Sequence, residues 1–547
     1  MYSKEKIVSL HEAMKTRRQN FDNIWRRVAQ YIKPSDQYFN EERTQGQQQM
    51  QYVFDTTAII ALNRFAASMS SYMTPVNQKW HSLALNSVKG EAPQSHEIDK
   101  WLEGVRDTLF ALRYRVGSGF DAATNECYLD VGAFGNASLF IDYEPGRGPI
   151  YRSIPLYESY WLLNQYGRVD TFHRDFKMTS RQIVEQFGDD APKPCKEDNE
   201  KAGLKEWNVI HSVHPNPDYV PDSQVAGQRK FVGCYLIKGT DTGPIAPSYY
   251  RTFPYAIFRY QVSAREDYAR GIGMMCLADV LTLNQMAMTN LDSMKLATQP
   301  PLLATEDLAT IGVSFYPSAV NYGGIDPTTG RPNIIPLETR VDLNAAFVSE
   351  DRRREIVNQA FMVDLFSILA DRPNMTATEV LQRAQERGVL TNPFYSRSQA
   401  EGFGPMIERE LDIAMTMSLI DDPPEEIAGR AELSIVYESP LAKAMRSEDG
   451  IAILNFMQGL AAIAQFDPKA PMLIDGIEMT KNLAKVYGLN ASNLKSNEQV
   501  EQEEAAEQQQ LELQNLLAAA PVAASAAKDL GQAAQTATFS PDPIMGI

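Results

Sequence analysis

The sequence predicts an α+β protein centred on two long helices, residues 274–298 and 342–369, separated by an insert that resists helix formation. At ~1.5 Å per residue, each helix would be a rod about 40 Å long. Pro300 and Pro301 end the first rod, because proline removes an amide donor and clashes with the preceding turn. Such a stalk has a large lateral surface and little core of its own. It is therefore predicted to pack against copies of itself in the wall of a ring or tube.

The insert between the rods is predicted to form a small β unit. Residues 313–316 and 333–337 have the β-branched and apolar character of short strands. Glycines and prolines interrupt the chain around them: Gly323, Gly324, Pro327, Gly330, Pro332 and Pro336. A β knob at the end of the stalk follows from this pattern.

The half of the chain before the stalk mixes helices and strands. Helices are predicted at residues 4–33, 55–73 and 98–116; Asp55 would cap the second, and Pro34 and Pro75 end the first two. The period then changes to that of strands. We expect strands at residues 137–143, 151–154, 160–164 and 169–176, a turn at 165–168, and further short strands across 209–260.

The half after the second rod is predicted to be helical. Residues 362–376 form a proline-containing connection, and Thr376 with Glu379 makes a capping box that starts the next helix. Helices are expected at residues 377–387, 396–419 and within 447–487. The tail from residue 497 is rich in Glu, Gln and Ala, which predicts a polar helix that frays into disorder.

Composition bounds the possible functions. The 547 residues, 44% of them hydrophobic, suffice for three or more units with their own cores. The net charge of -17 argues against tight general binding to nucleic acid, although DNA as a passing cargo stays compatible. The start of the chain leads into a charged helix, and no window reaches the ~20 apolar residues of a membrane span. We expect neither secretion nor membrane passage.

Reactive motifs are not found, so the chain is predicted not to be an enzyme and to carry no cofactor. Gly271-Ile272-Gly273 resembles the start of a dinucleotide loop, but Cys276 stands at the third glycine position. His211 and His214 could join two cysteines at a zinc site, yet neither thiol has a partner at short spacing. The four cysteines, Cys127, Cys195, Cys234 and Cys276, are instead predicted to be free thiols.

Two segments of the stalk region carry candidate functional charges. Arg352, Arg353 and Arg354 lie among acidic residues on the second rod. They are interpreted either as a solvated or intersubunit ion-pair ladder, or as contacts to DNA phosphate. Residues 362–376 are either an ordinary helix connection or a loop that projects into a channel.

Several motifs occur in order along most of the chain. They are the Ala and Ser-rich residues 64–75 with Trp80; Gly167-Arg168-Val169-Asp170-Thr171 with Arg174, Phe176, Met178-Thr179 and Phe187-Gly188; Arg270-Gly271; and, most specifically, Met375-Thr376-Ala377-Thr378-Glu379-Val380 with Arg383, Glu386, Pro393, Arg397, Glu401, Pro405 and Arg409. This order resembles the head-to-tail connector, or portal, proteins of short-tailed bacteriophages. Where that family has Tyr-Gly-Arg-Gly, this chain has Tyr268-Ala269-Arg270-Gly271.

The resemblance implies a portal-like subunit with a mixed α/β wing, a two-helix stem, a small β-containing clip, a helical crown and a polar C-terminal tail. The implied ranges are wing 1–265, first stem helix 266–299, clip 300–338, second stem helix 339–361, channel loop 362–376, wing or tunnel helices 377–430, crown 431–496 and tail 497–547. It also implies DNA-channel candidates, Arg352, Arg353, Arg354, Asp371, Arg372 and Asn374; a cap of the channel loop, Thr376 and Glu379; and clip residues that dock terminase or tail proteins, Tyr316, Asn321, Tyr322 and Arg331.

The implied assembly is a ring of twelve subunits at one capsid vertex of the virion, assembled in the host cytoplasm. Its implied partners are the major capsid and scaffolding proteins, a transient terminase motor, tail adaptor and tube proteins, and double-stranded DNA that passes through the channel. Twelve copies at -17 carry about -200 charges, which would keep DNA from adhering. Two alternatives stay open: another oligomeric virion protein of the tail or internal core, and a metal-dependent DNA-processing enzyme.

Overall fold

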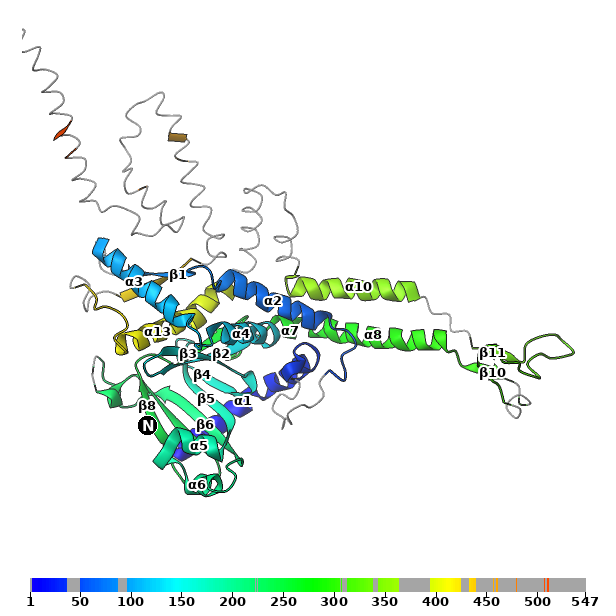
Figure 1. Ribbon diagram of the computed structural model, residues 1–547, viewed down its shortest axis with the longest axis horizontal. Coiled ribbons are helices and arrows are strands. Elements are labelled where there is room, and N and C mark those ends of the chain that lie inside the picture. The colour runs from blue at the N-terminus through cyan, green and yellow to red at the C-terminus, as the bar shows by residue number, and fades with distance from the viewer. Residues whose placement is uncertain are drawn as a thin grey trace, which may run out of the picture.

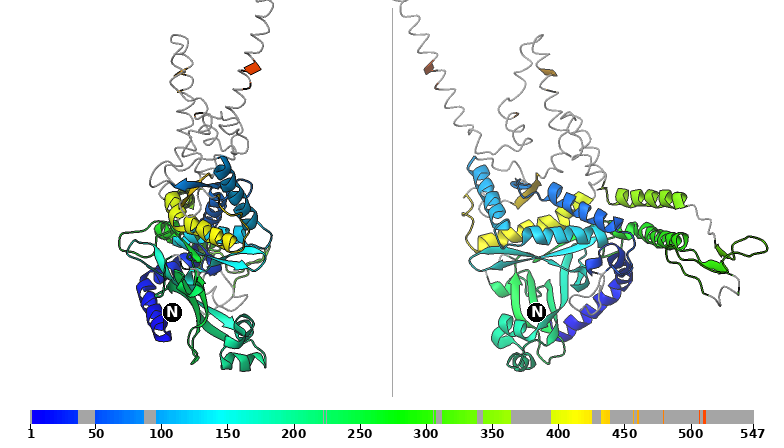
Figure 2. Two further views of the ribbon diagram at one scale, coloured as in Figure 1. Left: turned by 90° about the vertical axis from the view of Figure 1, so that its left-hand side faces the viewer. Right: turned by 45° about the vertical axis from the view of Figure 1, so that its right-hand side comes forward.

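The protein has a broad body of helices and sheets, from which two paired helices project as a stalk (Figures 1 and 2). The computed structural model describes residues 2–36, 50–86, 96–221, 223, 225–304, 306, 312–337, 343–363, 394–424 and 432–438. It also describes the single positions 456, 459, 460, 479, 506, 509 and 510. The predicted α+β class is confirmed.

Four helices from the first part of the chain lie in the upper layer and along one flank of the body (Figure 1). They are α1 (Lys4–Tyr31), α2 (Thr57–Met73), α3 (His96–Arg113) and α4 (Phe120–Phe134). The first three were predicted. The N-cap position of α2 is Thr56, one residue later than expected, but the Asp55 carboxylate still accepts the Thr57 amide at 2.8 Å. Helix α4 was not predicted. Ten of its fifteen residues are buried, and its exposed residues, Asp121, Ala122, Asn125 and Glu126, are confined to its first two turns.

A three-stranded antiparallel sheet lies beneath α4. Its order is β3-β2-β9, with β2 (Asn136–Glu144) between β3 (Gly148–Ile154) and β9 (Tyr255–Arg259). Gly135 joins α4 to β2 with a φ of +82°, a conformation that favours glycine. Predicted strands 137–143 and 151–154 are confirmed.

A five-stranded antiparallel sheet forms the lower part of the body. Its order is β4 (Ser159–Leu163), β5 (Val169–Thr179), β6 (Glu206–Pro215), β7 (Phe231–Ile237) and β8 (Ile245–Tyr250). Successive residues of β6 face opposite sides, as the strand period requires. Val209 packs toward α5 (Ser180–Phe187) and α6 (Lys193–Asn199), and Ile210 packs toward Ile7 of α1. Both faces are therefore covered, and α1 crosses the sheet (Figure 1).

The stalk consists of α7 (Ile272–Met275), α8 (Leu277–Thr298) and α10 (Leu343–Ala360), with a break at Cys276. The predicted rods are confirmed except at the end of the second. Residues 342–369 were expected to be helical, but α10 ends at Ala360, because Met362 adopts a φ of +57° that an α-helix cannot accommodate. Residues 364–393 lie outside the described residues.

The insert contains β10 (Leu302–Ala304) paired antiparallel with β11 (Ile334–Pro336). The predicted strand 333–337 is confirmed by β11, but the strand expected at 313–316 is wrong. There the Asn321 side chain accepts the Ser314 amide at 2.8 Å and donates to its carbonyl at 2.9 Å. These bonds take up the backbone groups that a partner strand would have used.

The chain returns to the body after the stalk. The π-helix η5 (Ser398–Phe403) and α13 (Gly404–Thr416) confirm most of the predicted helix 396–419. At the predicted start of the crown, residues 431–496, the structure has a strand: β12 (Glu432–Tyr437) pairs antiparallel with β1 (His81–Asn86). The bounds of the crown stay a prediction. Predicted helices 377–387 and 447–487 and the tail from 497 lie outside the described residues, apart from the single positions given above.

Four short turns complete the described elements. They are η1 (Pro34–Asp36), η2 (Leu156–Glu158), η3 (Gly188–Asp190) and η4 (Ala226–Gln228). Helix α5 was not predicted, yet two residues of the portal-like motifs stand at its two ends. Thr179 forms a capping box with Gln182 at its start, and Gly188 ends it with a positive φ.

Candidate functional sites along the stalk

The two stalk helices share a core only near the body. Val280, Leu283 and Ala287 of α8 are buried, as are Val357 of α10 and Phe361 directly after it. In the part of α8 beyond Ala287, residues 288–298, no side chain is buried, and the same holds for residues 344–349 of α10. The outer half of the stalk therefore has no core within one subunit.

A set of polar contacts joins the stalk helices to each other and to the body. Arg354 of α10 forms ion pairs with Glu350 on its own helix and with Asp55, whose carboxylate lies 2.9 Å away before α2. Glu350, which is 4% exposed, also accepts a 2.7 Å hydrogen bond from Asn290 of α8. We call Asp55, Asn290, Glu350 and Arg354 the polar latch. It binds three helices together where the stalk leaves the body.

The three arginines predicted as DNA contacts therefore differ from one another. Arg353 forms an ion pair with Asp279 of α8, and Arg354 belongs to the polar latch. Arg352 is exposed, and the described residues include no ion-pair partner for it. The ion pairs of Arg353 and Arg354 lie within one subunit. They test neither a contact with DNA nor an ion-pair ladder between subunits, so both interpretations stay predictions.

Large apolar side chains are exposed on the outer stalk. Val348 of α10 is 69% exposed. Others on the outer parts of the two helices and on or beside the β10–β11 pair are Met288, Leu291, Met294, Leu296, Leu302, Leu303, Ile335, Leu337 and Phe347. Exposed apolar side chains gathered on one part of a protein are typical of surfaces that bind another surface.

The predicted clip residues lie at the outer end of the stalk. Tyr316 and Tyr322 are 83% and 81% exposed, and Arg331 is also exposed. Asn321 is engaged with the Ser314 backbone, so its side chain shapes the loop. Asn321 and Tyr322 line one open hollow there. Tyr316 and Tyr322 thus expose aromatic rings that a partner could contact, whereas the Asn321 side chain supports the local loop structure.

The root of the stalk is packed backbone to backbone against the end of α4. A Cβ atom on Gly271 would lie 2.3 Å from the Gly135 nitrogen, and one on Gly273 would lie 2.6 Å from the Ala133 carbonyl oxygen. Close packing therefore accounts for both glycines of the Gly271-Ile272-Gly273 motif. A dinucleotide loop is not needed to explain them.

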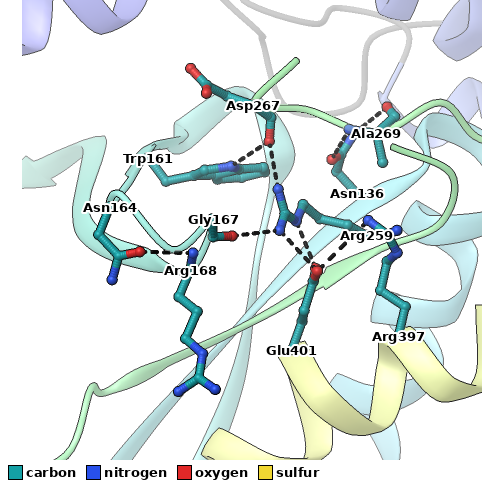
Figure 3. Close-up of polar contacts among 10 residues, drawn as sticks. All are labelled: Asn136, Trp161, Asn164, Gly167, Arg168, Arg259, Asp267, Ala269, Arg397 and Glu401. Carbon is teal, nitrogen blue, oxygen red and sulfur yellow. Dashed lines mark hydrogen bonds and ion pairs between the residues drawn. The ribbon is translucent and has the colours of Figure 1, made fainter. Parts of the chain in front are cut away.

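Asn136 holds the segment that enters the stalk. Its side chain accepts the Ala269 amide at 2.8 Å and donates to the Ala269 carbonyl at 2.8 Å, and it is fully buried (Figure 3). Ala269 does not have a positive φ. The departure from the family's Tyr-Gly-Arg-Gly pattern is therefore tolerated, because the backbone here does not require glycine.

Arg259, at the end of β9, forms hydrogen bonds to three segments that are far apart in sequence or in the fold (Figure 3). It donates to both oxygens of Glu401 at 2.7 and 2.9 Å, to the Gly167 carbonyl at 3.1 Å and to the Asp267 carbonyl at 3.4 Å. Arg397 approaches the same carboxylate at 3.7 Å. Arg259 and Asn136 were not predicted from the sequence. The sequence did contain one indication of this site, because Gly167, Arg397 and Glu401 all occur in the portal-like motifs.

The zinc hypothesis for the histidines and cysteines is not supported. His211 and His214 lie on opposite faces of β6, and His211 Nδ1 lies 2.6 Å from the Tyr255 hydroxyl. Within the described part of the chain, no three His, Cys, Asp or Glu side chains are grouped to hold a metal ion. The four cysteines are buried and free, as predicted.

Other predicted features fall beyond what the structure describes. Asp371, Arg372, Asn374, Thr376 and Glu379 lie outside the described residues, so the channel loop and its capping box remain predictions. Among the helices that are described, none is both long and apolar enough to cross a lipid bilayer.

Comparisons with known proteins agree with the motif order. The family described as bacteriophage head to tail connecting protein matches residues 4–494. A probable portal protein of Bordetella phage BPP-1 is 26% identical over 497 residues, covering 88% of this chain and 87% of the relative. The portal protein of Salmonella phage epsilon15 is 25% identical over 557 residues, covering 100% of this chain and 98% of the relative. The chain therefore belongs to the bacteriophage head to tail connecting protein family.

Proposed function

We propose that this chain is the portal subunit of a bacteriophage, and that copies of it form a twelve-membered ring at one capsid vertex. Double-stranded DNA would enter and leave the head through this ring. The family match over residues 4–494 and the two portal relatives support the proposal. The stalk supports it independently, since its outer half has no core in a single subunit and exposes many apolar side chains.

The exposed stalk carries the assembly part of the proposal. Burying apolar surface stabilises by about 25 cal/mol per Å², so side chains such as Leu291 and Val348 gain stability only when a neighbour covers them. A ring supplies an identical neighbour on each side through head-to-tail contacts. The stalk helices would then form the wall of the channel.

The described elements suggest how the subunit is divided. Residues 1–265 would form the wing, α7, α8 and α10 the stem, and residues 300–338 the clip. Residues 362–376 would form the channel loop and 377–430 the helices that return to the wing. Because β12 pairs with β1, we place the start of the crown after Tyr437. The tail from 497 would follow it.

The electrostatic part of the proposal concerns DNA passage. Twelve copies at -17 carry about -200 charges, so the ring would repel DNA overall. Among the three arginines of α10, Arg352 is the candidate for a direct phosphate contact, because Arg353 and Arg354 are engaged in ion pairs. Asp371, Arg372 and Asn374 remain candidates on the channel loop.

The partners follow from the portal role. The ring would contact the major capsid and scaffolding proteins, a transient terminase motor and the tail adaptor and tube proteins. The exposed Tyr316 and Tyr322 would serve docking at the clip. It would assemble in the host cytoplasm and stay in the virion. The chain itself would catalyse no reaction, because the motor protein would hydrolyse the nucleotide.

The mass and symmetry of the purified full-length protein test the proposal. Electron microscopy should show annular particles with a central hole, and light scattering should give a mass of about twelve subunits. The expected rings should also form at physiological salt, since apolar stalk contacts depend little on charge. A compact monomer at high concentration, with no annular species, would contradict the portal assignment.

A further inference from the structure

Arg259 is a buried cation that joins parts of the chain far apart in sequence. Its residue is 3% exposed, and its guanidinium contacts Glu401, Gly167 and Asp267 (Figure 3). The planar group presents five donors in fixed directions, so one side chain can serve a carboxylate and two carbonyls at once. A lysine ammonium at the end of a flexible stem cannot reproduce this geometry.

The three contacts belong to elements with different places in the fold. Gly167 lies in the turn between β4 and β5, where its φ is +75°. Asp267 precedes α7 and so lies at the root of the stalk. Glu401 lies in η5, shortly after residues 364–393 and therefore after the predicted channel loop. Arg259 thus connects the stalk root to the helix that carries the chain back from that loop.

Further contacts make the stalk root a fixed attachment. The Trp161 indole donates to the Asp267 carbonyl at 3.2 Å, and Arg17 pairs with the Asp267 carboxylate at 3.1 Å. Asn136 holds Ala269 on both backbone groups. Among these described contacts, Arg259 is the one that also reaches η5.

We infer that Arg259 is a positioning residue that fixes the stalk root relative to η5, so that a displacement of either element acts on the other. If the chain is a portal subunit, force on the channel loop during DNA passage would reach the stem through this side chain. That consequence depends on the proposed function, whereas the mechanical link does not.

A second buried arginine provides a matched control. Arg113 of α3 donates to both oxygens of Glu410 on α13, at 3.1 and 2.5 Å, and both residues are buried. The pair resembles Arg259 with Glu401 in chemistry, since each arginine donates to both oxygens of one carboxylate, but Glu410 is fully buried whereas the Glu401 side chain is 25% exposed. Helix α13 follows η5 directly. The contacts of Arg113 in the described residues, which include His81, do not reach the stalk root.

The test compares Arg259→Lys with Arg113→Lys in the full-length protein by amide hydrogen exchange. A charged hydrogen bond contributes enough that its loss should speed local exchange about tenfold. We expect Arg259→Lys to accelerate exchange in residues 267–275 and 394–404 together, and Arg113→Lys to leave residues 267–275 unchanged. Should either lysine variant fail to fold, Glu401→Gln and Glu410→Gln give the same comparison.

Acceleration in only one of the two segments, or in neither, would overturn the inference. Equal acceleration of residues 267–275 by both arginine variants would also overturn it, since that would show general destabilisation. The exchange experiment does not require a ring. If annular particles were absent while the expected exchange pattern appeared, the portal proposal would fail and the role of Arg259 would stand.

Discussion

Single residues at the stalk root show how closely this part of the protein is packed. Gly135 and Gly271 bring two backbones together at a separation that leaves no room for a Cβ atom. Asn136 then satisfies both backbone groups of the neighbouring Ala269 inside the protein. Because an unpaired backbone group is costly when buried, these bonds and the close contact depend on each other.

We predict that Gly271→Ala destabilises the chain, whereas Gly104→Ala stabilises it. The added methyl group at Gly271 would lie 2.3 Å from the Gly135 nitrogen, which should cost about 1–3 kcal/mol or more. Gly104 lies within α3 with nothing near its Cβ position, so alanine should add about 0.5–1 kcal/mol of helix stability. Urea unfolding measures both changes. A stable Gly271→Ala variant would show that the two backbones can separate freely.

Buried histidines make stability depend on pH. Burial lowers the pKa of His211 to about 3 and that of His214 to about 4, and it holds the pKa of His173 well below its ordinary value. In the unfolded chain a histidine takes up a proton below about pH 6.5. The unfolded state therefore binds more protons between these values, so folding stability must fall as the pH drops below 6.5.

For His211 the window from pH 6.5 to pH 5 is about 1.5 units, which corresponds to about 2 kcal/mol. Between pH 7.5 and pH 5, the free energy of unfolding should therefore fall by about 2 kcal/mol less in His211→Gln than in the parent chain. The measurement is the difference between unfolding free energies at the two pH values, so a constant cost of the substitution cancels. Equal pH slopes for both proteins would contradict a neutral His211.

At the scale of elements, predictability followed the local signal. The stalk helices and strands β2 to β5 were predicted from helical and alternating periods that proline and glycine punctuate. Helix α4 was missed because its exposed face is short: Asp121, Ala122, Asn125 and Glu126 recur at helical spacing, but residues 130–134 are all buried. Strands β1 and β12 pair across about 350 positions, a relation that no local pattern carries. The contacts of Arg259 were missed for two reasons. Glu401 and Gly167 are far from Arg259 in sequence, and two of its acceptors are backbone carbonyls, which every residue carries.

The polar latch separates the roles of the stalk arginines. We expect Arg354→Gln to destabilise the attachment of the stalk by about 2 kcal/mol, because it leaves Asp55 and the buried Glu350 without their cation, although Arg354 itself is partly exposed. Arg352→Gln should leave stability unchanged, since that side chain is exposed. Thermal unfolding of both variants tests this. Equal stability losses would show that Arg352 also supports the fold.

The exposed Arg352 is accordingly the better probe of DNA contact. If it binds phosphate in the assembled channel, Arg352→Gln should weaken retention of DNA and lower the slope of log affinity against log salt by about 0.9 for each lost contact. Replacing all three arginines would also open the polar latch and confuse the two effects. Unchanged retention and slope in rings of normal appearance would assign DNA contact to other residues.

At the scale of the whole molecule, the body and the outer stalk differ in how much buried core stabilises them. The body has two covered sheet faces and a continuous core, whereas the outer stalk has exposed apolar residues and a core only at its base. We therefore expect the body to fold as a single subunit, and under the proposed function the outer stalk would be stabilised by neighbouring subunits. Assembly should then be sensitive to substitutions that leave the subunit itself intact.

We predict that Leu291→Ser combined with Met294→Ser prevents ring formation without unfolding the subunit. These side chains are 45% and 43% exposed, so one subunit loses little, whereas each ring interface would lose about 1 kcal/mol for every covered side chain. Val116→Ser is the control, because Val116 is 97% exposed in the turn between α3 and α4 and belongs to neither stalk helix. Circular dichroism should show normal unfolding for both proteins. Electron microscopy should show rings for the control alone, and rings from the double variant would mean that this face of α8 does not join subunits.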